Sequence, residues 1–393
     1  MLCPVDPRCQ GGGRLKITIV QGAFLPVPPR RGGAVEKIWF ALGKEFARCG
    51  HEVTHISRAF EELPREENSD GVRYLRVPGF DAPKSLVVLK FLDLLYSLRV
   101  RRMLPVADIL VTNTFWLPML VRSASVGNLY VHVARYPKGQ MRFYSHASRI
   151  QTVSNRIKEA ILAQVPSLAA KVHCIGNPLP ARSEAIPVPQ GSSNREKQVL
   201  FVGRIHPEKG IELLIDGFAR LPASRFGNWK LVIIGPAEAK SGGGGEAYLA
   251  GLKRRSAALG DRIVWTGPVF DAACLQEHYR KAALFVYPSL ADLGEASPLA
   301  PLEAMDCGCP ALVSDLGCFR DYLSDGATGF VFDHRGPNAV DALATKLGQL
   351  LENPDELRRV GEAGQGKARQ FSLESVAAQY MADFHSILDN HRG

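Results

Sequence analysis

Two carboxylates, Glu295 and Glu303, lie eight positions apart on either side of an expected helix start. Ser297 suits the N-cap of this helix, and Pro298 suits its first position, where the missing N–H costs nothing. The free N–H groups and the positive end of the helix dipole favour an anionic group. The stretch is therefore suited to a phosphorylated polyol, with the phosphate at the helix start and the hydroxyls on the carboxylates. The alternative is a short amphipathic helix with two solvated acids, and these residues alone do not separate the two.

Two basic residues, Arg204 and Lys209, flank a predicted strand-to-helix turn. Both would lie at the carboxyl end of a strand and near a helix N-terminus, where they are suited to clamp a diphosphate. A solvated basic turn is the alternative, although it explains poorly why both charges flank one turn. Upstream, Gly32 and Gly33 precede the first long helix and would let the backbone approach a ligand closely, unless they only make a flexible loop.

Two further positions follow predicted strands. A lone histidine such as His132 is more often packed and hydrogen-bonded than catalytic, but its place at a strand's carboxyl end favours a role in the site. Pro268 and Val269 could rest against a flat ring, or they form a plain turn. The chain shows no metal-ligand cluster, no P-loop and no Gly-x-Ser-x-Gly elbow, so these patterns indicate no metal or cofactor site.

Strands alternate with helices along the chain, which predicts an α/β fold of two doubly wound, mostly parallel sheets, facing each other across a cleft. Ligands of such sheets bind at the carboxyl ends of the strands, where the candidate residues lie. A stretch rich in Pro, Ser, Gly and charge divides the two halves. The expected parts are a disordered tail at 1–13, an N-terminal domain at 14–180, a linker at 181–197, a C-terminal domain at 198–371 and a final helix at 372–393.

The net charge of +9 is unevenly distributed along the 393 residues. Residues 1–180 hold 25 Lys and Arg against 13 Asp and Glu, whereas residues 181–393 hold 23 against 26. A basic first half predicts an acidic partner, such as a phosphorylated substrate or an anionic membrane surface. Nucleic acid ranks last, because the chain has no aromatic-interleaved RNA motif and no zinc-finger spacing.

The leucine-rich stretch 83–103 predicts a helix that ends in Arg99, Arg101 and Arg102. Its leucines at 86, 89, 92, 95 and 98 are expected on the inner face; the alternative is a helix lying on an anionic membrane. The eight cysteines are scattered, and we find no secretory leader, which predicts reduced thiols in a cytoplasmic protein. The inner face of the membrane is the other expected location.

Seven motifs follow one another along the chain. They are Gly32-Gly33-Ala-Val-Glu36, Arg48-Cys-Gly-His-Glu-Val-Thr54, Val153-Ser-Asn-Arg-Ile-Lys158, Ile175-Gly-Asn-Pro178, Phe201-Val-Gly-Arg-Ile-His-Pro-Glu-Lys-Gly210, the E-x7-E stretch from Glu295 to Glu303 with Ala304-Met-Asp-Cys-Gly-Cys-Pro310, and Asp325-Gly-Ala-Thr-Gly329. Each motif is modest, but their order is specific. In this order they resemble the motifs of glycosyltransferase family 4, the retaining "glycosyl transferases group 1" with the GT-B fold, over about residues 14–390.

The resemblance implies a nucleotide sugar on the C-terminal domain, an acceptor on the N-terminal domain, and a last helix that returns to the N-terminal domain. By it, Arg204 and Lys209 would hold the diphosphate, and Glu303 would bind the ribose. Glu295 would touch the donor sugar, and His132 would lie near that sugar and the transferring centre. Gly33 would approach the diphosphate, and Pro268 or Val269 would lie by the base.

One segment departs from the family pattern, which often has small glycine-type residues after the first Glu. Pro298 cannot donate a hydrogen bond there, whereas Ser297 and Leu299 still offer N–H groups.

The expected function is retaining, metal-independent sugar transfer from a UDP- or GDP-sugar to an oligosaccharide or lipid-linked acceptor, in polysaccharide or glycoconjugate assembly. The alternatives are a nucleotide-sugar epimerase of the same fold and a non-catalytic protein that binds nucleotide sugars.

Overall fold

The computed structural model describes residues 13–31, 33–122, 124–180 and 195–389. Most of the predicted tail at 1–13 and of the predicted linker at 181–197 lies outside these residues. The contacts divide the chain into two compact units. The N-terminal unit comprises the described residues up to 180 and those from Ser372 onward, and the C-terminal unit runs from Arg195 to Phe371.

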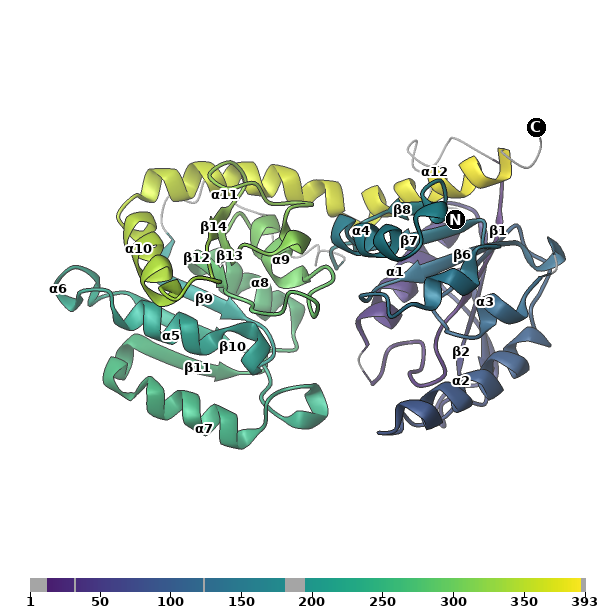
Figure 1. Ribbon diagram of the computed structural model, residues 1–393, viewed down its shortest axis with the longest axis horizontal. Helices are drawn as coiled ribbons and strands as arrows, with labels where there is room; N and C mark the ends of the chain where they lie inside the picture. Colours follow the sequence, from purple (N-terminus) through teal and green to yellow (C-terminus); the bar gives the residue numbers. More distant parts are fainter. Residues whose placement is uncertain (1–12, 32, 123, 181–194, 390–393) are drawn as a thin grey trace. The chain divides into compact units, whose positions relative to one another are not determined.

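The N-terminal unit contains a sheet in the order β3-β4-β2-β1-β5-β6-β7-β8, parallel except for the β3–β4 pair (Figure 1). Its described strands are β1 (Lys16–Val20), β2 (Glu52–Arg58), β3 (Glu66–Ser69), β4 (Val72–Val77), β5 (Ile109–Thr112), β6 (Asn128–Val133), β7 (Arg149–Thr152) and β8 (Val172–Cys174), and its helices are α1 (Ala34–Arg48), α2 (Leu86–Arg101), α3 (Leu117–Leu120), α4 (Asn155–Gln164) and α12 (Leu373–Asp389).

The C-terminal unit contains a sheet in the order β11-β10-β9-β12-β13-β14, and all of its pairs are parallel. Its described strands are β9 (Glu196–Val202), β10 (Lys230–Ile234), β11 (Ile263–Gly267), β12 (Ala282–Tyr287), β13 (Ala311–Ser314) and β14 (Phe330–Phe332), and its helices are α5 (Ile211–Ala219), α6 (Ala223–Phe226), α7 (Glu246–Arg255), α8 (Ala272–Lys281), α9 (Leu299–Asp306), α10 (Ala339–Leu351) and α11 (Pro354–Ala368). The prediction of two doubly wound α/β sheets is confirmed.

Helix α12 packs on the N-terminal unit, although it follows the C-terminal unit in sequence (Figure 1). Its Tyr380 lies edge-on to Trp39 of α1, with ring centroids 5.1 Å apart, and its Phe384 lies 5.8 Å from the ring of Phe46. Trp39 and Phe46 belong to the apolar stripe that the 3.6-residue period predicts for α1, and both are buried. The same stripe therefore packs against both the sheet and α12.

Helix α2 corrects one prediction. The leucines at 86, 89, 92, 95 and 98 do not form one buried face, because Leu86 is 70% exposed and Leu98 is 38% exposed. A spacing of three residues falls about 60° short of a full helical turn at each step, so five such leucines spread over about 240° of the helix. The buried residues of α2 are Asp93, Tyr96, Ser97 and Val100.

The prediction of reduced thiols throughout is also wrong, because Cys49 at the end of α1 is disulfide-bonded. Scattered cysteines in a sequence do not show which thiols the fold brings together. Among the described residues, Cys274, Cys307, Cys309 and Cys318 are free thiols. Among the described residues, no helix combines the length and the apolar character needed to cross a membrane.

Candidate functional site

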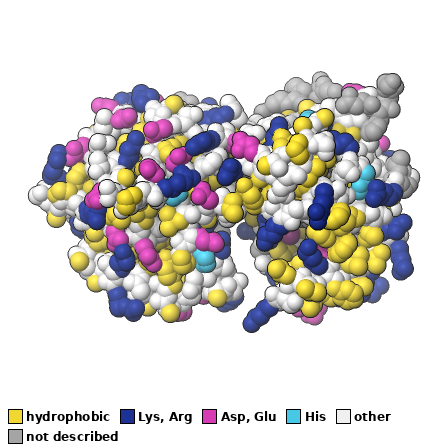
Figure 2. All heavy atoms as spheres, viewed as in Figure 1, with side chains coloured by type: hydrophobic (Ala, Val, Ile, Leu, Met, Phe, Trp, Pro, Cys, Tyr) yellow, Lys and Arg dark blue, Asp and Glu magenta, His cyan; other side chains and the backbone are white. Residues whose placement is uncertain are grey.

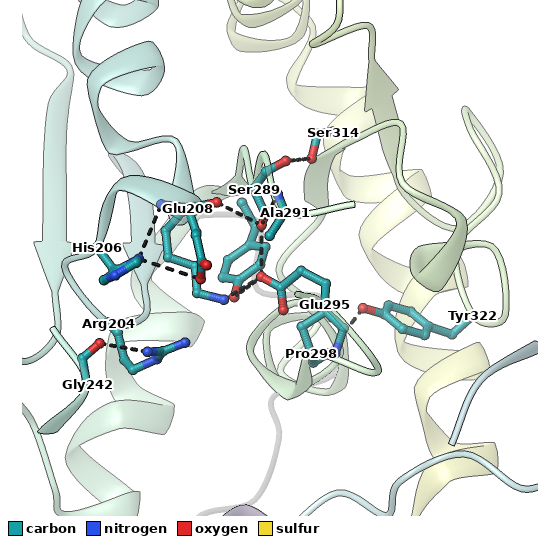
Figure 3. A network of polar contacts seen from close by, with 12 residues as sticks. Arg204, His206, Glu208, Gly242, Ser289, Ala291, Glu295, Pro298, Ser314 and Tyr322 are labelled. Atoms are coloured by element: carbon teal, nitrogen blue, oxygen red, sulfur yellow. Dashed lines mark hydrogen bonds and ion pairs between the residues drawn. The ribbon is translucent and has the colours of Figure 1, made fainter. Parts of the chain in front are cut away.

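The strand order of the C-terminal sheet reverses between the neighbouring strands β9 and β12. From β9 the chain continues outward to β10 and β11, and from β12 it continues outward on the other side to β13 and β14. In doubly wound sheets the loops diverge at such a point and leave a crevice at the carboxyl ends of the strands. Lys209 lies on the connection that follows β9, and Glu295 lies on the loop that follows β12. The sheet order therefore brings the two predicted site loops together (Figure 3).

Lys209 and Glu295 form a buried ion pair, with residue exposures of 6% and 7%. The Oε1 atom of Glu295 accepts hydrogen bonds from Lys209 Nζ and from the hydroxyl of Tyr287 at 3.0 Å, and it lies 2.8 Å from Ser289 Oγ. A buried ion pair tolerates its loss of hydration only when further hydrogen bonds surround it. Burial, followed by the charge of Glu295, raises the pKa of Tyr287 well above its ordinary value, so Tyr287 stays a hydrogen-bond donor.

Ser289 joins this pair to the backbone of the neighbouring loops. Its Oγ also lies 3.1 Å from the carbonyl oxygen of Glu208, and its single hydroxyl hydrogen can serve either that oxygen or Glu295. The carbonyl oxygen of Ser289 accepts a hydrogen bond from Ser314 Oγ at 2.6 Å (Figure 3). The loops after β9 and β12 and the last residue of β13 are thus tied to one another by polar contacts.

Gly210 allows the two loops to approach so closely. Its φ of +67° lies in the left-handed region, and a Cβ at this position would collide with the carbonyl oxygen of Pro288. Only glycine satisfies both conditions without strain. The glycine that ends the predicted strand-to-helix turn is therefore what sets the separation between the Lys209 turn and the chain after β12.

Arg204 lies on the same turn but outside the buried pair. Its side chain is exposed, and its Nη1 donates to the carbonyl oxygen of Gly242 at 2.6 Å. Gly242 begins the run of four glycines and has a φ of +77°. The structure thus holds the Arg204 guanidinium against the glycine loop and leaves it accessible from solvent (Figure 3).

Helix α9 begins one residue later than predicted. Its N-cap is Pro298, whose ψ of 129° is extended and whose carbonyl oxygen accepts from the Tyr322 hydroxyl at 3.2 Å. The expectation that Ser297 caps the helix with Pro298 in its first turn is therefore wrong. Proline fixes φ but not ψ, and so a proline that suits a helix start can also precede it. Ser297 and Leu299 are both half-buried at this helix start.

Glu303 lies on α9, and its Oε2 accepts a hydrogen bond from the hydroxyl of Tyr279 at 3.0 Å. Tyr279 comes from α8 and is buried, which raises its pKa well above the ordinary value. Pro268 and Val269 follow β11, which is the edge strand of the sheet and is separated from β9 by β10. The contacts of the described residues do not join these two residues to the Lys209–Glu295 pair.

Gly33 and His132 belong to the N-terminal unit. Gly33 is the N-cap of α1 with a φ of +95°, and a Cβ there would collide with the carboxylate of Glu36. Burial raises the pKa of that carboxyl group. His132, near the end of β6, is 4% exposed, and burial lowers its pKa to about 4. The partner glycine of the predicted pair, Gly32, lies outside the described residues.

Four residues of these sites were not identified from the sequence: Tyr287, Ser289, Tyr279 and Gln151. A signal existed for two of them. Tyr287 ends an otherwise apolar strand, and Ser289 lies on the loop that follows it toward Glu295. Polar groups at that position line the ligand side of such sheets. Tyr279 and Gln151 act through contacts with residues 24 and 19 positions away, for which the sequence pattern gives no signal.

Comparisons with known proteins agree with this architecture. Residues 33–178 match the family model "Glycosyl transferase 4-like domain", and residues 183–367 match "Glycosyl transferases group 1". The chain is 31% identical over 199 residues to D-inositol 3-phosphate glycosyltransferase from Segniliparus rotundus, a match that covers 50% of this chain and 42% of that protein. It is 29% identical over 199 residues to phosphatidyl-myo-inositol mannosyltransferase from Mycobacterium tuberculosis, covering 50% and 49%.

The matched part of the chain thus spans less than half the length of these two relatives. Among solved structures, HepE from Anabaena in complex with UDP and glucose superposes with a TM-score of 0.68 at 17% identity, covering 95% of this chain and 100% of that chain. A likeness at this identity shows that the fold is GT-B. The two family matches together span most of the sequence, and the chain therefore belongs to the glycosyl transferases group 1, the glycosyltransferase 4 family.

Proposed function

We propose that this protein is a retaining glycosyltransferase that moves a sugar from a UDP- or GDP-sugar to an oligosaccharide or lipid-linked acceptor, in polysaccharide or glycoconjugate assembly. The observation that carries the proposal is the buried Lys209–Glu295 pair at the switch point of the C-terminal sheet, in a chain of this family. A cation and a carboxylate held together at the place where such sheets bind ligands are suited to a substrate that carries both phosphate and sugar hydroxyls.

The chemistry follows from where charge develops. The departing nucleoside diphosphate becomes more negative in the transition state, and Lys209, Arg204 and the N-terminus of α9 supply positive potential for it. In retaining transfer the acceptor hydroxyl attacks the face from which the leaving group departs. The leaving phosphate then takes the hydroxyl proton, so no protein base is required. The proposal assigns charge neutralisation to these side chains and needs no divalent metal.

The remaining contacts with the donor are assigned by the family pattern. Glu303 binds the ribose hydroxyls, Glu295 the donor sugar, and Pro268 or Val269 the base. Ser297 and Leu299 offer backbone N–H groups to the donor. In the N-terminal unit, Gly33 approaches the diphosphate and His132 lies near the donor sugar. Two observations support these assignments: Glu303 and Glu295 are held by tyrosine hydroxyls, and the related HepE fold has been solved with UDP and glucose.

The acceptor is proposed to be anionic or to reside at an anionic membrane. The two relatives are named for an inositol phosphate and a phosphatidylinositol acceptor, and the N-terminal half of this chain carries the excess of positive charge. On α2, Leu86, Val87 and Phe91 are 70%, 79% and 57% exposed. Figure 2 shows hydrophobic side chains gathered over this part of the N-terminal unit, with Lys and Arg side chains beside them. We propose that α2 contacts the cytoplasmic face of a membrane.

The donor is identified by a screen for slow hydrolysis. The protein is incubated with UDP- and GDP-sugars, and the released nucleoside diphosphate and the free sugar are measured together. Release of both from one donor supports a transferase that uses water as a poor acceptor. A change in the sugar without release of nucleoside diphosphate supports the epimerase alternative. Binding of the donor without either product supports the non-catalytic alternative and contradicts the proposal.

The membrane contact is tested by co-sedimentation with vesicles of phosphatidylcholine alone and with added phosphatidylserine. Replacing Arg99, Arg101 and Arg102 together by serine is expected to weaken binding to the anionic vesicles, at about 1 kcal/mol for each residue near the surface. A control replaces Arg225, Arg254 and Arg358 of the C-terminal unit, with the same change in net charge. Equal binding by the two variants contradicts the proposal.

A further inference from the structure

His132 and Gln151 form a buried side-chain pair across two neighbouring strands. They lie directly opposite each other in the parallel ladder of β6 and β7, and their exposures are 4% and 0%. The Nδ1 atom of His132 lies 2.5 Å from Oε1 of Gln151. The resemblance singled out His132, whereas Gln151 has no role in the function proposed above.

The orientation of the Gln151 amide is fixed by the backbone around it. Its Nε2 donates to the carbonyl oxygens of Thr152 and Ile175, each at 2.7 Å. An amide nitrogen has two hydrogens, and each carbonyl oxygen accepts one of them. The flipped amide would place its oxygen against two carbonyl oxygens, so the acceptor Oε1 must be the atom that faces His132.

This orientation decides where the proton of His132 lies. Because Oε1 can only accept, the contact requires an N–H on Nδ1. Burial lowers the pKa of His132 to about 4, so the ring is neutral at pH 7 and carries one proton. The other ring nitrogen, Nε2, is therefore a bare lone pair. It is buried and has no hydrogen-bond partner among the described residues.

The ring itself is held in place from a second side. The indole of Trp39 lies edge-on to His132, with ring centroids 5.3 Å apart and planes at 83°. Trp39 is 1% exposed and belongs to the α1 stripe that packs on the sheet. The imidazole thus has little freedom to rotate, and the direction of its Nε2 lone pair is set by the fold.

We propose that Gln151 is a positioning residue that locks His132 in the Nδ1–H tautomer, so that Nε2 accepts a hydrogen bond from a hydroxyl of the sugar substrate. A buried acceptor without a partner costs free energy in the unliganded protein, and a sugar hydroxyl would satisfy it. The consequence for transfer rests on the proposed function, but the tautomer is a property of the protein without substrate.

The tautomer is measured directly by NMR on the full-length protein labelled with 15N-histidine. Two-bond correlations between ring nitrogens and carbon-bound hydrogens distinguish a protonated nitrogen from a bare one. The chain has 10 histidines, and the His132→Gln variant identifies the signal of His132 by its loss. The expected result at pH 7 is a protonated Nδ1 and a bare Nε2. A protonated Nε2 in the unaltered protein overturns the proposal, whether or not sugar transfer is later found.

Gln151→Met separates the positioning role from a structural one. Methionine keeps the length of the side chain but cannot accept the Nδ1 hydrogen bond as an amide oxygen does, so the share of the Nε2–H tautomer is expected to rise. The control is Gln164→Met, because Gln164 also pairs with backbone groups, Pro137 and Gly139, but does not touch His132. An unchanged His132 tautomer in Gln151→Met overturns the proposal, and if that variant does not fold, the measurement on the unaltered protein still decides.

Kinetics on the same variants then ask whether the tautomer matters for transfer. With the donor that the hydrolysis screen identifies, turnover in Gln151→Met is expected to fall about tenfold, which is the typical contribution of one hydrogen bond. The affinity for free UDP or GDP is expected to stay the same. Loss of nucleotide affinity together with turnover would indicate general damage to the fold and contradict a positioning role. If the tautomer shifts in the NMR spectrum but turnover is unchanged, His132 is no acceptor for the substrate.

Discussion

Each unit contains a buried cluster in which a carboxylate contacts a basic side chain and a tyrosine hydroxyl. The two clusters differ in how many of the carboxylate's oxygens are already in contact with the protein. In the N-terminal unit, Asp383 of α12 uses both of its oxygens: Oδ1 lies 2.9 Å from Arg149 and 3.0 Å from His173, and Oδ2 accepts from the Tyr130 hydroxyl at 2.8 Å. In the C-terminal unit, all three partners of Glu295 contact Oε1. Among the described residues, Oε2 of Glu295 has no hydrogen-bond partner.

The difference indicates two purposes. A carboxylate whose two oxygens both contact groups from β6, β7 and β8 fastens α12 to the sheet. Burial alone would raise the pKa of Asp383, but the hydrogen bonds from His173 and Tyr130, together with the charge of Arg149, outweigh burial and lower it. A carboxylate held by one oxygen is fixed in place and still has an acceptor for a ligand. We infer that the Asp383 cluster serves stability and the Glu295 cluster serves the substrate.

The largest expected effect comes from removing the charge of Asp383. Asp383→Asn keeps the size of the side chain but leaves Arg149 buried without a counter-charge, which costs about 3–5 kcal/mol of stability. Urea unfolding at pH 7, with the two units followed separately by hydrogen exchange, measures this cost. The loss is expected on the N-terminal unit. Because the pKa of Asp383 is lowered by folding, its stabilisation is present above the unfolded pKa and is lost as the pH falls. A loss of less than about 1 kcal/mol in the free energy of unfolding would contradict the stabilising role assigned to this cluster.

The matched change at the other cluster is Glu295→Gln, which is expected to act on transfer. The amide oxygen keeps the place of Oε1 among Lys209, Tyr287 and Ser289, but a hydrogen-bond donor replaces Oε2. Turnover is expected to fall about 10²- to 10³-fold, as when one preorganised polar group of an active site is removed. Donor turnover assays at a temperature where the variant is still folded check this. Unaltered turnover in Glu295→Gln would contradict the role in substrate binding that we infer for the Glu295 cluster.

Much of this arrangement could be predicted from local pattern. The 3.6-residue period identified the buried stripe of α1, and the alternation of strands and helices placed Lys209 and Glu295 at carboxyl ends of strands. What could not be predicted is pairing across the chain. Lys209 and Glu295 are 86 positions apart, and Tyr130 and Asp383 are 253 apart. The sequence shows that each residue lies on a suitable loop or helix, but only the order of the strands decides which loops meet.

The errors have physical reasons as well. On α2 a leucine at every third position suggests one buried face, but such a series drifts around an α-helix. At α9 a proline that fits the first turn took an extended ψ instead and became the residue before it. The edge strand β3 is not predictable from the sequence pattern, because its residues, Glu66 to Ser69, carry no apolar alternation and pair antiparallel to β4 alone. These are positions where a weak local preference gave way to packing.

A third buried carboxylate, Asp93 of α2, sharpens the comparison because no cation in the described part of the chain pairs with it. Among the described residues it accepts hydrogen bonds only from the backbone N–H groups of Phe115 and Trp116, both at 3.2 Å. Burial raises its pKa to about 6 despite these hydrogen bonds. The folded protein therefore binds the proton more tightly than the unfolded chain, and stability falls as the pH rises from about 4 to about 6.

The Asp93→Asn variant removes this titration. Relative to the unaltered protein, its stability is expected to improve by about 3 kcal/mol between pH 4 and pH 7, the worth of a shift of about two pH units. Urea unfolding at the two pH values measures the difference, and subtraction cancels the other titrating groups. A difference that does not change with pH would mean that Asp93 is ionised and satisfied like Asp383.

The smallest expected effect separates the two halves of the Lys209–Glu295 pair. If Lys209 holds the diphosphate, Lys209→Ala removes a charge-assisted hydrogen bond and weakens binding of UDP or GDP about 10- to 100-fold. Glu295→Gln is expected to leave that affinity unchanged, because its partner on the donor is the sugar, which free nucleoside diphosphate lacks.

Calorimetry with both nucleotides compares the two variants with Lys230→Ala. This control removes the same charge from the first residue of β10, at the end of the strand away from the ligand-binding loops. Lys209 is buried and its Nζ also lies 5.3 Å from the centroid of the Tyr287 ring, so its ammonium is shielded from solvent in the unliganded protein. Equal affinities in Lys209→Ala and Lys230→Ala would mean that Lys209 only neutralises Glu295. The C-terminal cluster would then be a structural ion pair like that of Asp383.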